Sequence, residues 1–324
     1  MIFVETPWGQ KIIINAVTKR LARDLQTKIS INHVDFSLFN QMNLDGVLVE
    51  DRGRDTLLYA GEVRVRVTDW FFFKKKAELK YIGLKDALIK FQRTDSVWSQ
   101  QFFLDYFASP SSGKKKKNAG IQFNLKKMEL DNVSFIKKDA WLGQDLFIHT
   151  GSLFMDANNI SLSGTDYDIN KLNLIDPVFS QYNYKGLKPS VKSILVNNTT
   201  SEVDTGYSWN MGNTIIKIGS LKIKNGTLKL DKQTDRLAYD YFDGQHILFS
   251  QIDGEIKDSR LIGDTVFSRI ELSAKERSGL ELKNMTAALK LSPKEMAFAD
   301  LELTTNKSTI RNYFSMSYDD ISDM

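Results

Sequence analysis

The chain has 324 residues, with 44 Lys and Arg against 40 Asp and Glu and a formal net charge of +4. Apolar residues make up 42% of it, which excludes a disordered chain because such chains lack the bulky side chains that form a core. No apolar run approaches the ~20 residues of a membrane-spanning helix, so a polytopic membrane protein is excluded. The absence of cysteine excludes disulfide scaffolds, thiolate metal sites and cysteine nucleophiles.

Residues 7–28 are predicted to form one amphipathic helix. Thr6 is a suitable N-cap residue, and Pro7 fits the first turn because its missing N–H has no helical partner there. Apolar side chains then recur at steps of three and four residues, which places them on one stripe. That stripe consists of Trp8, Ile12, Ala16, Val17, Leu21 and Leu25.

This helix has two interpretations. It either caps a β-sheet or lies as a basic amphipathic segment beside a membrane, and both can hold together. In the second case the membrane-proximal residues are Trp8, Lys11, Lys19 and Arg20.

From Ile29 onward the hydrophobic period changes to two. Val63, Val65 and Val67, for example, alternate with polar neighbours. Such alternation is typical of strands with one apolar and one solvated face. Helical periodicity does not return at a convincing length, so the sequence predicts an antiparallel β protein behind a helical cap, with residues 1–28 as the helix and 29–324 as the β region.

A short pattern recurs in the β region. Apolar residues two positions apart are followed by an Asp or Asn, and then by apolar residues on the other parity. The markers are spaced 41, 46, 44 and 49 residues apart, and the pattern fades after about residue 250. The five marker residues are Asp45, Asp86, Asn132, Asp176 and Asn225.

The parity change has a structural interpretation. A one-residue register change would turn every apolar side chain to the wrong face, and a bulge at each Asp or Asn would keep them on one face while the strand bends. A two-residue hairpin is the alternative, most plausibly at Asn225-Gly226. Stacking of such units predicts an elongated, curved sheet with one apolar and one polar surface.

Residues with catalytic or metal-binding chemistry do not cluster in the sequence. His33, His149 and His246 lie far apart and outside any metal-binding spacing, and no nucleophile elbow, Walker loop or dinucleotide fingerprint occurs. Asp166 and Asp168 could form a carboxylate pair but are better explained by a loop. We therefore expect neither an enzyme nor a cofactor or metal site.

Two basic runs remain. Lys114–Lys117 follows a Ser/Pro/Gly segment and is predicted to lie in an exposed loop, and Lys74–Lys76 follows the aromatic run Trp70–Phe73. The second run is either a strand end before a charged turn or a contact with anionic lipid head groups. Nucleic-acid binding is disfavoured because acidic residues are mixed throughout the chain.

Several segments resemble a known family. Thr6-Pro7-Trp8-Gly9-Gln10 resembles the start of the TamB family of translocation and assembly module subunits, within the AsmA-like superfamily. The segments at residues 44–51 and 53–61 are also similar to that family, as is the closing Phe314-Ser315-Met316-Ser317-Tyr318. The likeness covers essentially the whole chain but only the N-terminal portion of typical members. The family's membrane helix and C-terminal domain have no counterpart, so we expect a fragment of a longer protein.

This resemblance implies a repeating β-groove, or half-pipe, in the bacterial periplasm. Full-length members are anchored in the inner membrane, are thought to pass phospholipid between inner and outer membranes, and pair with an outer-membrane barrel of the TamA type. The resemblance thus implies phospholipid and such a barrel as partners. It also implies contact with the inner membrane through the family's N-terminal membrane helix, which is missing from this sequence.

The alternating residues supply a physical candidate for that groove. Apolar residues on both sides of each marker are expected to face one trough that holds acyl chains: Val63, Val65, Val67, Leu84, Ile89, Phe91, Leu130, Phe135, Leu221, Ile223, Leu228 and Leu230. A different function is a scaffold whose sheet edges pair with strands of outer-membrane proteins during their assembly. A carbohydrate-binding solenoid is a third, less favoured interpretation.

Overall fold

The computed structural model describes residues 18–37, 41–67, 76–107, 120–160, 165–189, 210 and 212–318. Several residues that the sequence analysis named have no described side chain. They are Trp8, Lys11, Lys74–Lys76, Lys114–Lys117 and Val67. Of the predicted helix, the described part covers residues 18–25, and both Lys19 and Arg20 are exposed there.

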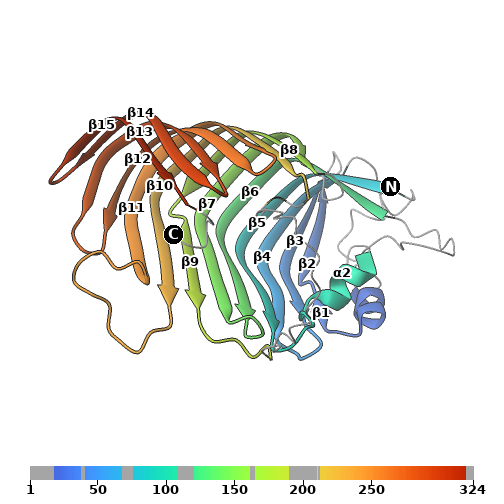
Figure 1. Ribbon diagram of the computed structural model, residues 1–324. Coiled ribbons are helices and arrows are strands. Elements are labelled where there is room, and N and C mark those ends of the chain that lie inside the picture. Colours follow the sequence, from blue (N-terminus) through green and yellow to red (C-terminus); the bar gives the residue numbers. More distant parts are fainter. Residues whose placement is uncertain are drawn as a thin grey trace, which may run out of the picture.

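The described chain forms one sheet of 15 strands that curves strongly (Figure 1). The first nine strands are β1 (Ile29–Ser30), β2 (His33–Ser37), β3 (Gln41–Glu50), β4 (Thr56–Val67), β5 (Lys76–Arg93), β6 (Gly120–Asp139), β7 (Gln144–Ile160), β8 (Asp166–Ile175) and β9 (Val178–Asn183). The remaining strands are β10 (Ile215–Lys232), β11 (His246–Ile262), β12 (Thr265–Glu276), β13 (Glu281–Ser292), β14 (Glu295–Thr305) and β15 (Thr309–Ser317).

The sheet is mixed, which corrects the prediction of an antiparallel one. β5 pairs with β6 in parallel, and β10 pairs in parallel with both β8 and β9, whereas the other pairs are antiparallel. Both parallel junctions follow long connections, and the first contains a short helix, α2 (Gln101–Phe107), that the sequence analysis missed. A long connection can return the chain to the edge from which it left, which a tight hairpin cannot.

One further expectation and one alternative fail. Asp166 and Asp168 lie in strand β8 rather than in a loop. Asn225-Gly226 is not a hairpin, because β10 runs through it from Ile215 to Lys232. An 18-residue strand that changes parity at its centre lies where the alternative placed a turn.

Four of the five predicted markers are backbone kinks, three of them within strands and Asp176 between β8 and β9. Asp86, Asn132, Asp176 and Asn225 all adopt the left-handed conformation, with φ between 49° and 54°. In the first copy the left-handed residue is Gly46, one position after the predicted Asp45. Asp and Asn tolerate this conformation better than other residues with a side chain, because their short polar groups bond locally.

The kinks are aligned across neighbouring strands rather than inserted as single extra residues. On β3 and β4 the register is the same before the kink, where Asp45 pairs with Glu62, and after it, where Val47 pairs with Ala60. The same holds across β5 and β6, where Asp86 and Asn132 stand opposite each other. Left-handed residues also occur beyond residue 250, where the sequence pattern fades: Gln251, Asp258, Asp300 and Asn312.

The aligned kinks define a repeat of three strands. β3, β4 and β5 form one antiparallel meander, and β6, β7 and the pair β8–β9 form the next. Equivalent kinks, such as Asp86 and Asp176, are therefore about 90 residues apart, twice the predicted spacing. We call the line of kinks across neighbouring strands the kink row, and the middle strand of each meander has a glycine there. A Cβ at Gly61 would lie 3.3 Å from the Cβ of Asp86, and a Cβ at Gly151 would lie 3.2 Å from the Cβ of Asp176.

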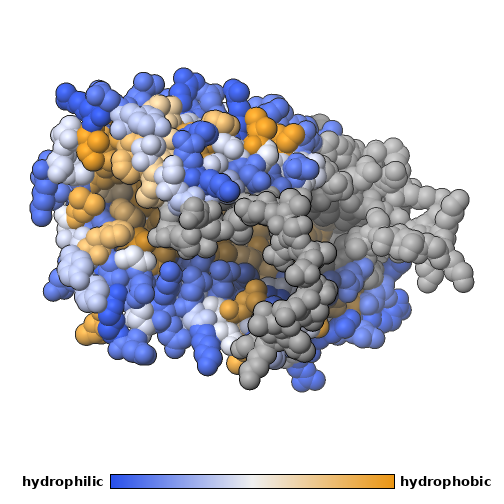
Figure 2. All heavy atoms as spheres, viewed as in Figure 1, coloured by the Kyte–Doolittle hydropathy of each residue, from blue (hydrophilic) through white to orange (hydrophobic). Residues whose placement is uncertain are grey.

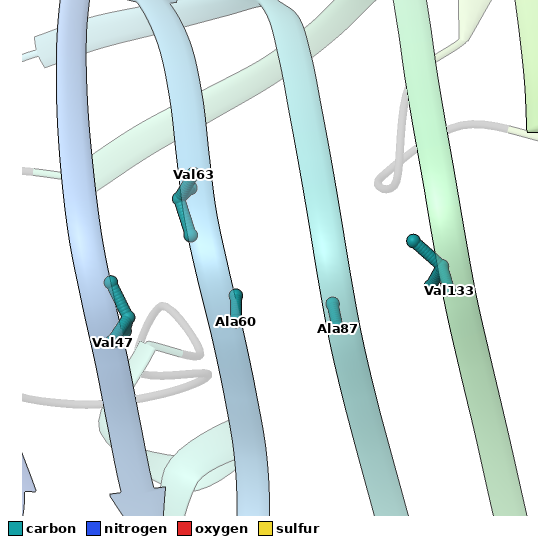
Figure 3. Close-up of a cluster of buried hydrophobic side chains, with 5 residues drawn as sticks. All are labelled: Val47, Ala60, Val63, Ala87 and Val133. Atoms are coloured by element: carbon teal, nitrogen blue, oxygen red, sulfur yellow. The ribbon is translucent and has the colours of Figure 1, made fainter.

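Small apolar side chains are buried where the first four long strands meet. Val47, Ala60, Val63, Ala87 and Val133 form a cluster beside the kink row (Figure 3). A second cluster joins the helix at residues 18–25 and α2 to the same face, through Leu25, Val49, Leu57 and Phe102. Both helices thus pack against residues of β1, β3, β4 and β5 in this cluster.

Replacing Asn132 tests the kink. We expect Asn132→Val to lower the free energy of unfolding by about 2 to 3 kcal/mol, because a β-branched residue disfavours the left-handed region and the bond from Asn132 Nδ2 to Asp86 Oδ1 is lost. Asn132→Gly should cost only about 1 kcal/mol, since it loses the hydrogen bond alone. Urea unfolding followed by circular dichroism measures both. Asn284→Val on β13 is the control, and an equal loss in that control would contradict the kink's role.

Candidate functional site: an apolar hollow

Two rows of apolar residues run across the strands on one face of the sheet. The first row lies on one side of the kinks, and each member is the ladder partner of the next apart from a break at Gly254: Leu44, Val63, Leu84, Leu130, Leu153, Leu174, Ile223, Leu272, Met285, Leu303 and Ile310. The second row lies on the other side: Val49, Leu58, Ile89, Phe135, Ile148, Phe179, Leu228 and Phe249.

Between the rows runs a line of smaller side chains, directly after the kinks. Val47, Ala60, Ala87, Val133 and Thr150 are successive ladder partners along this line. We call the parts of a strand before and after its kink its two limbs. Large side chains on both limbs and small ones between them leave space over the middle of the sheet. This space is the hollow.

The hollow has a volume of about 630 Å³ and is lined by residues from β5 to β11. Its lining is almost entirely apolar; His149, Thr150 and Thr227 are the polar residues among the described ones. The side chain of Thr150 is satisfied, because its hydroxyl donates to the carbonyl of Ser152 at 2.8 Å. Figure 2 shows apolar residues within the concave side and hydrophilic residues along the margins. The hollow therefore suits an apolar ligand rather than a charged one.

Half of the predicted groove residues line the hollow, and they come from both limbs. These six are Leu84, Ile89, Leu130, Phe135, Ile223 and Leu228. Val63 and Val65 pack in the cluster of Figure 3 or against it. Phe91 lies under the two helices and contacts Phe135 edge-on, with ring centroids 5.2 Å apart. Leu221 and Leu230 are in β10 but do not line the hollow.

Sequence reasoning missed the lining residues on β7 and β9. Ile148, Leu153 and Phe179 belong to the hollow, and Ile148 and Phe179 are 38% and 37% exposed. The kink on β7 lies at Gly151, which has no Asp or Asn marker. The alternation of Ile148 and Thr150 before the glycine, and of Leu153 and Met155 after it, is the signal that could have revealed this strand.

A buried ion pair holds the margin of the hollow where the first two meanders meet. Arg93 at the end of β5 donates through Nε and Nη2 to the two carboxylate oxygens of Asp139, at 2.7 and 2.8 Å. The side chain of Asp139 is completely buried, and Leu142 N also donates to it. The Arg93 guanidinium stacks over Trp98, 4.4 Å from the ring centroid. Hydrogen bonding from Arg93 is the main cause that lowers the pKa of Asp139.

A hydrogen bond supports the next turn along this margin. Tyr184, after β9, donates to Asp145 Oδ1 at 3.0 Å. Burial and this bond raise the pKa of Tyr184 to about 12. Together with the Arg93–Asp139 pair, this contact fixes the strand ends around the hollow.

Three features of the described residues bear on other classes of site. No three His, Asp or Glu side chains in this part of the chain converge so as to hold a metal ion. Within the same residues, no helix is both long and apolar enough to cross a membrane. His149 contacts Ser134 at 3.0 Å and stacks with Phe147.

The fold and the hollow together define a class: a β protein with one curved mixed sheet and an apolar concave face. No family model matches the chain, and no curated protein matches it. The residues themselves must therefore carry the functional argument.

The Asp139 pair makes stability depend on pH. Because its pKa is below the ordinary value of 3.8, Asp139 stabilises the fold above that pH, and this stabilisation is lost as the pH falls through its folded pKa. Asp139→Asn should cost about 3 kcal/mol at pH 7, since it leaves Arg93 without its partner, and should flatten the loss of stability between about pH 5 and 2. Urea midpoints across that range measure both effects. The exposed Asp131→Asn is the control. If Asp139→Asn lost stability at low pH as steeply as the unaltered protein does, Asp139 would not be the source of the pH dependence.

Proposed function

We propose that the chain conducts phospholipid between the inner and outer membranes, with acyl chains shielded in the apolar hollow. The observation that carries this proposal is the lining itself, which joins residues of seven neighbouring strands in one apolar surface, including both limbs of β5, β6, β7 and β10. Its volume of about 630 Å³ lies within the range of small-molecule sites. Hydrophilic residues lie along the margins of the concave side, where a head group would remain in water.

The energetic need for such a surface is large. Transferring an acyl chain into water costs about 0.8 kcal/mol for each CH₂ group, so a chain of roughly 16 carbons costs on the order of 12 kcal/mol. A continuous apolar trough lowers that barrier without a covalent step. The unbroken row from Leu44 to Ile223 supports continuity, because each side chain is the ladder partner of the next.

Several parts of the proposal rest on the family resemblance. We place the protein in the periplasm, anchored in the inner membrane in its full-length form, as an elongated repeating β-groove that is not an enzyme. Its partner there is an outer-membrane barrel of the TamA type. The helix at residues 18–25 acts with α2 as the cap of the first end of the groove, supported by their packing on Val49 and Leu57.

Neighbouring residues on opposite faces of β10 test the hollow. Ile223 lines it, whereas Lys222 is exposed and faces the other way. A photo-crosslinker at Ile223 should form phospholipid adducts in cells, and one at Lys222 should form none. Protein purified without detergent should carry phospholipid in native mass spectrometry, and Ile223→Asp should lower that occupancy about tenfold while Lys222→Asp leaves it unchanged. Protein free of lipid, with no adducts at Ile223, would refute the proposal.

One observation favours the scaffold function as a second candidate. β15 pairs only with β14 among the described strands, and all nine of its residues are exposed. It contains one charged residue, Arg311, and lacks the Lys and Pro residues that usually protect an edge. Its apolar residues Ile310 and Phe314 continue the concave face, so an added strand of alternating pattern would extend the sheet.

Crosslinking at the edge tests this second function. A photo-crosslinker at Tyr313 on β15 should capture a denatured outer-membrane barrel polypeptide added as a client, because the edge offers unpaired backbone groups. Tyr59 is the control: it is 45% exposed, but its strand β4 is paired on both sides. Ser315→Pro should abolish the capture at Tyr313 by removing a backbone donor. Equal capture at Tyr59 and Tyr313 would contradict pairing at the edge.

A further inference from the structure

Large apolar side chains are exposed along one margin of the sheet, at the ends of β6, β9, β10 and β12. We call this set the apolar rim, and it lies along the lower edge in Figure 1. The exposed fractions range from 40% at Leu280 to 91% at Leu237. The apolar rim consists of Leu142, Leu187, Leu237, Tyr239, Tyr241, Phe242 and Leu280.

The turns that carry the apolar rim are joined to one another. Leu187 N donates to the carbonyl of Ala140 at 2.9 Å, which fixes the segment after β9 beside the β6–β7 turn. Lys185 N donates to Gln233 Oε1 at 3.3 Å, which links that segment to the β10–β11 loop. Arg277 then donates through Nη1 to the carbonyl of Tyr239 at 2.8 Å, so the β12–β13 turn is attached as well. These bonds hold the turns that carry the apolar rim in fixed positions relative to one another.

The β10–β11 loop holds its aromatic side chains in place. Asp243 is 4% exposed and accepts both Nη1 and Nη2 of Arg236, at 2.6 and 2.9 Å. It also accepts the backbone N–H of Tyr239 and of Gln245. Arg236 lies over the Tyr239 ring, and Tyr239 stacks on Tyr241 with centroids 4.9 Å apart. A loop built around a buried ion pair that leaves Leu237, Tyr241 and Phe242 in water is organised for contact before any partner arrives.

The charges around the apolar rim indicate the kind of partner. Lys185, Lys188 and Lys232 are exposed and form no ion pair with a described residue. Arg277 adds a fourth cation, against the exposed carboxylates of Asp235 and Asp240. Arg236 does not contribute, because Asp243 neutralises it. The rim therefore combines Tyr, Phe and Leu tips with an excess of positive charge.

We propose that the apolar rim docks on a lipid bilayer that contains anionic head groups. Phe and Leu tips enter the acyl boundary, and Tyr side chains lie at the head-group level, where their apolar rings and polar hydroxyls are both accommodated. The flanking lysines contact the anionic head groups, as in interfacial membrane anchors. This contact is separate from lipid binding in the hollow and does not require it.

Flotation with vesicles tests the docking. The full chain is mixed with vesicles of phosphatidylcholine alone or with one-third phosphatidylglycerol, and the floated fraction is measured. We expect binding to the anionic vesicles, and a loss of about tenfold in partition for the triple variant Leu237→Ser, Tyr241→Ser, Phe242→Ser. Lys185→Glu with Lys188→Glu should remove the preference for anionic vesicles and its salt dependence.

The matched control is a triple variant at similarly exposed residues away from the apolar rim: Tyr59→Ser, Ile262→Ser and Phe267→Ser. It should float like the unaltered protein, and so should Ile223→Asp, which separates docking from the hollow. Absence of flotation with both vesicles overturns the proposal, as does an equal loss in the control triple. If sedimentation velocity shows self-association that only the rim variant abolishes, and vesicles do not bind, the rim is an interface between copies and the proposal is wrong.

Discussion

The sheet depends on one backbone conformation, a left-handed residue in the middle of a long strand. In an uninterrupted strand, side chains alternate between faces, and a strand of 18 residues would keep a single parity on its apolar side. In β10 the apolar parity is odd at Leu221 and Ile223 and even at Leu228 and Leu230, with Asn225 between them. Without the kink, one limb of the strand would present its lysines to the hollow. The kink is therefore what allows both limbs to enclose a single apolar space.

The side chain at each kink follows from its place in the repeat. Within a meander, short turns already set the register, and glycine occupies the row in the middle strand, where another side chain would crowd the neighbouring Asp. Between meanders the strands are parallel and long connections leave the register free. There an Asp faces an Asn: Asn132 donates to Asp86, and Asn225 donates to Asp176, each at 2.6 Å. These pairs fix the register at the junctions, in addition to permitting the kink.

This division explains what the sequence could and could not predict. The parity change at Asp86, Asn132, Asp176 and Asn225 is local, so it was readable from alternation and residue type, and the kinks lie where predicted. The parallel pairing of β5 with β6 was not readable, because it depends on the path of a long connection and not on either strand. The glycine-marked strands were missed for a related reason: Gly151 resembles any strand glycine until its neighbour Asp176 is placed beside it.

An open apolar hollow needs stabilisation from outside a closed core. The described clusters of buried apolar residues are small, and alanines recur in them, as at Ala60, Ala87 and Ala287. Bulky residues there would close the space over the kinks. The margins must supply more of the stabilisation, because strand ends beside an open hollow lack the packing of a second layer. Two arginine pairs with buried carboxylates, Arg93–Asp139 and Arg236–Asp243, stabilise the margin through bidentate hydrogen bonds rather than through buried apolar area. The second pair also holds the aromatic side chains of the apolar rim in water, so the group that secures the margin is the one that shapes its outward surface.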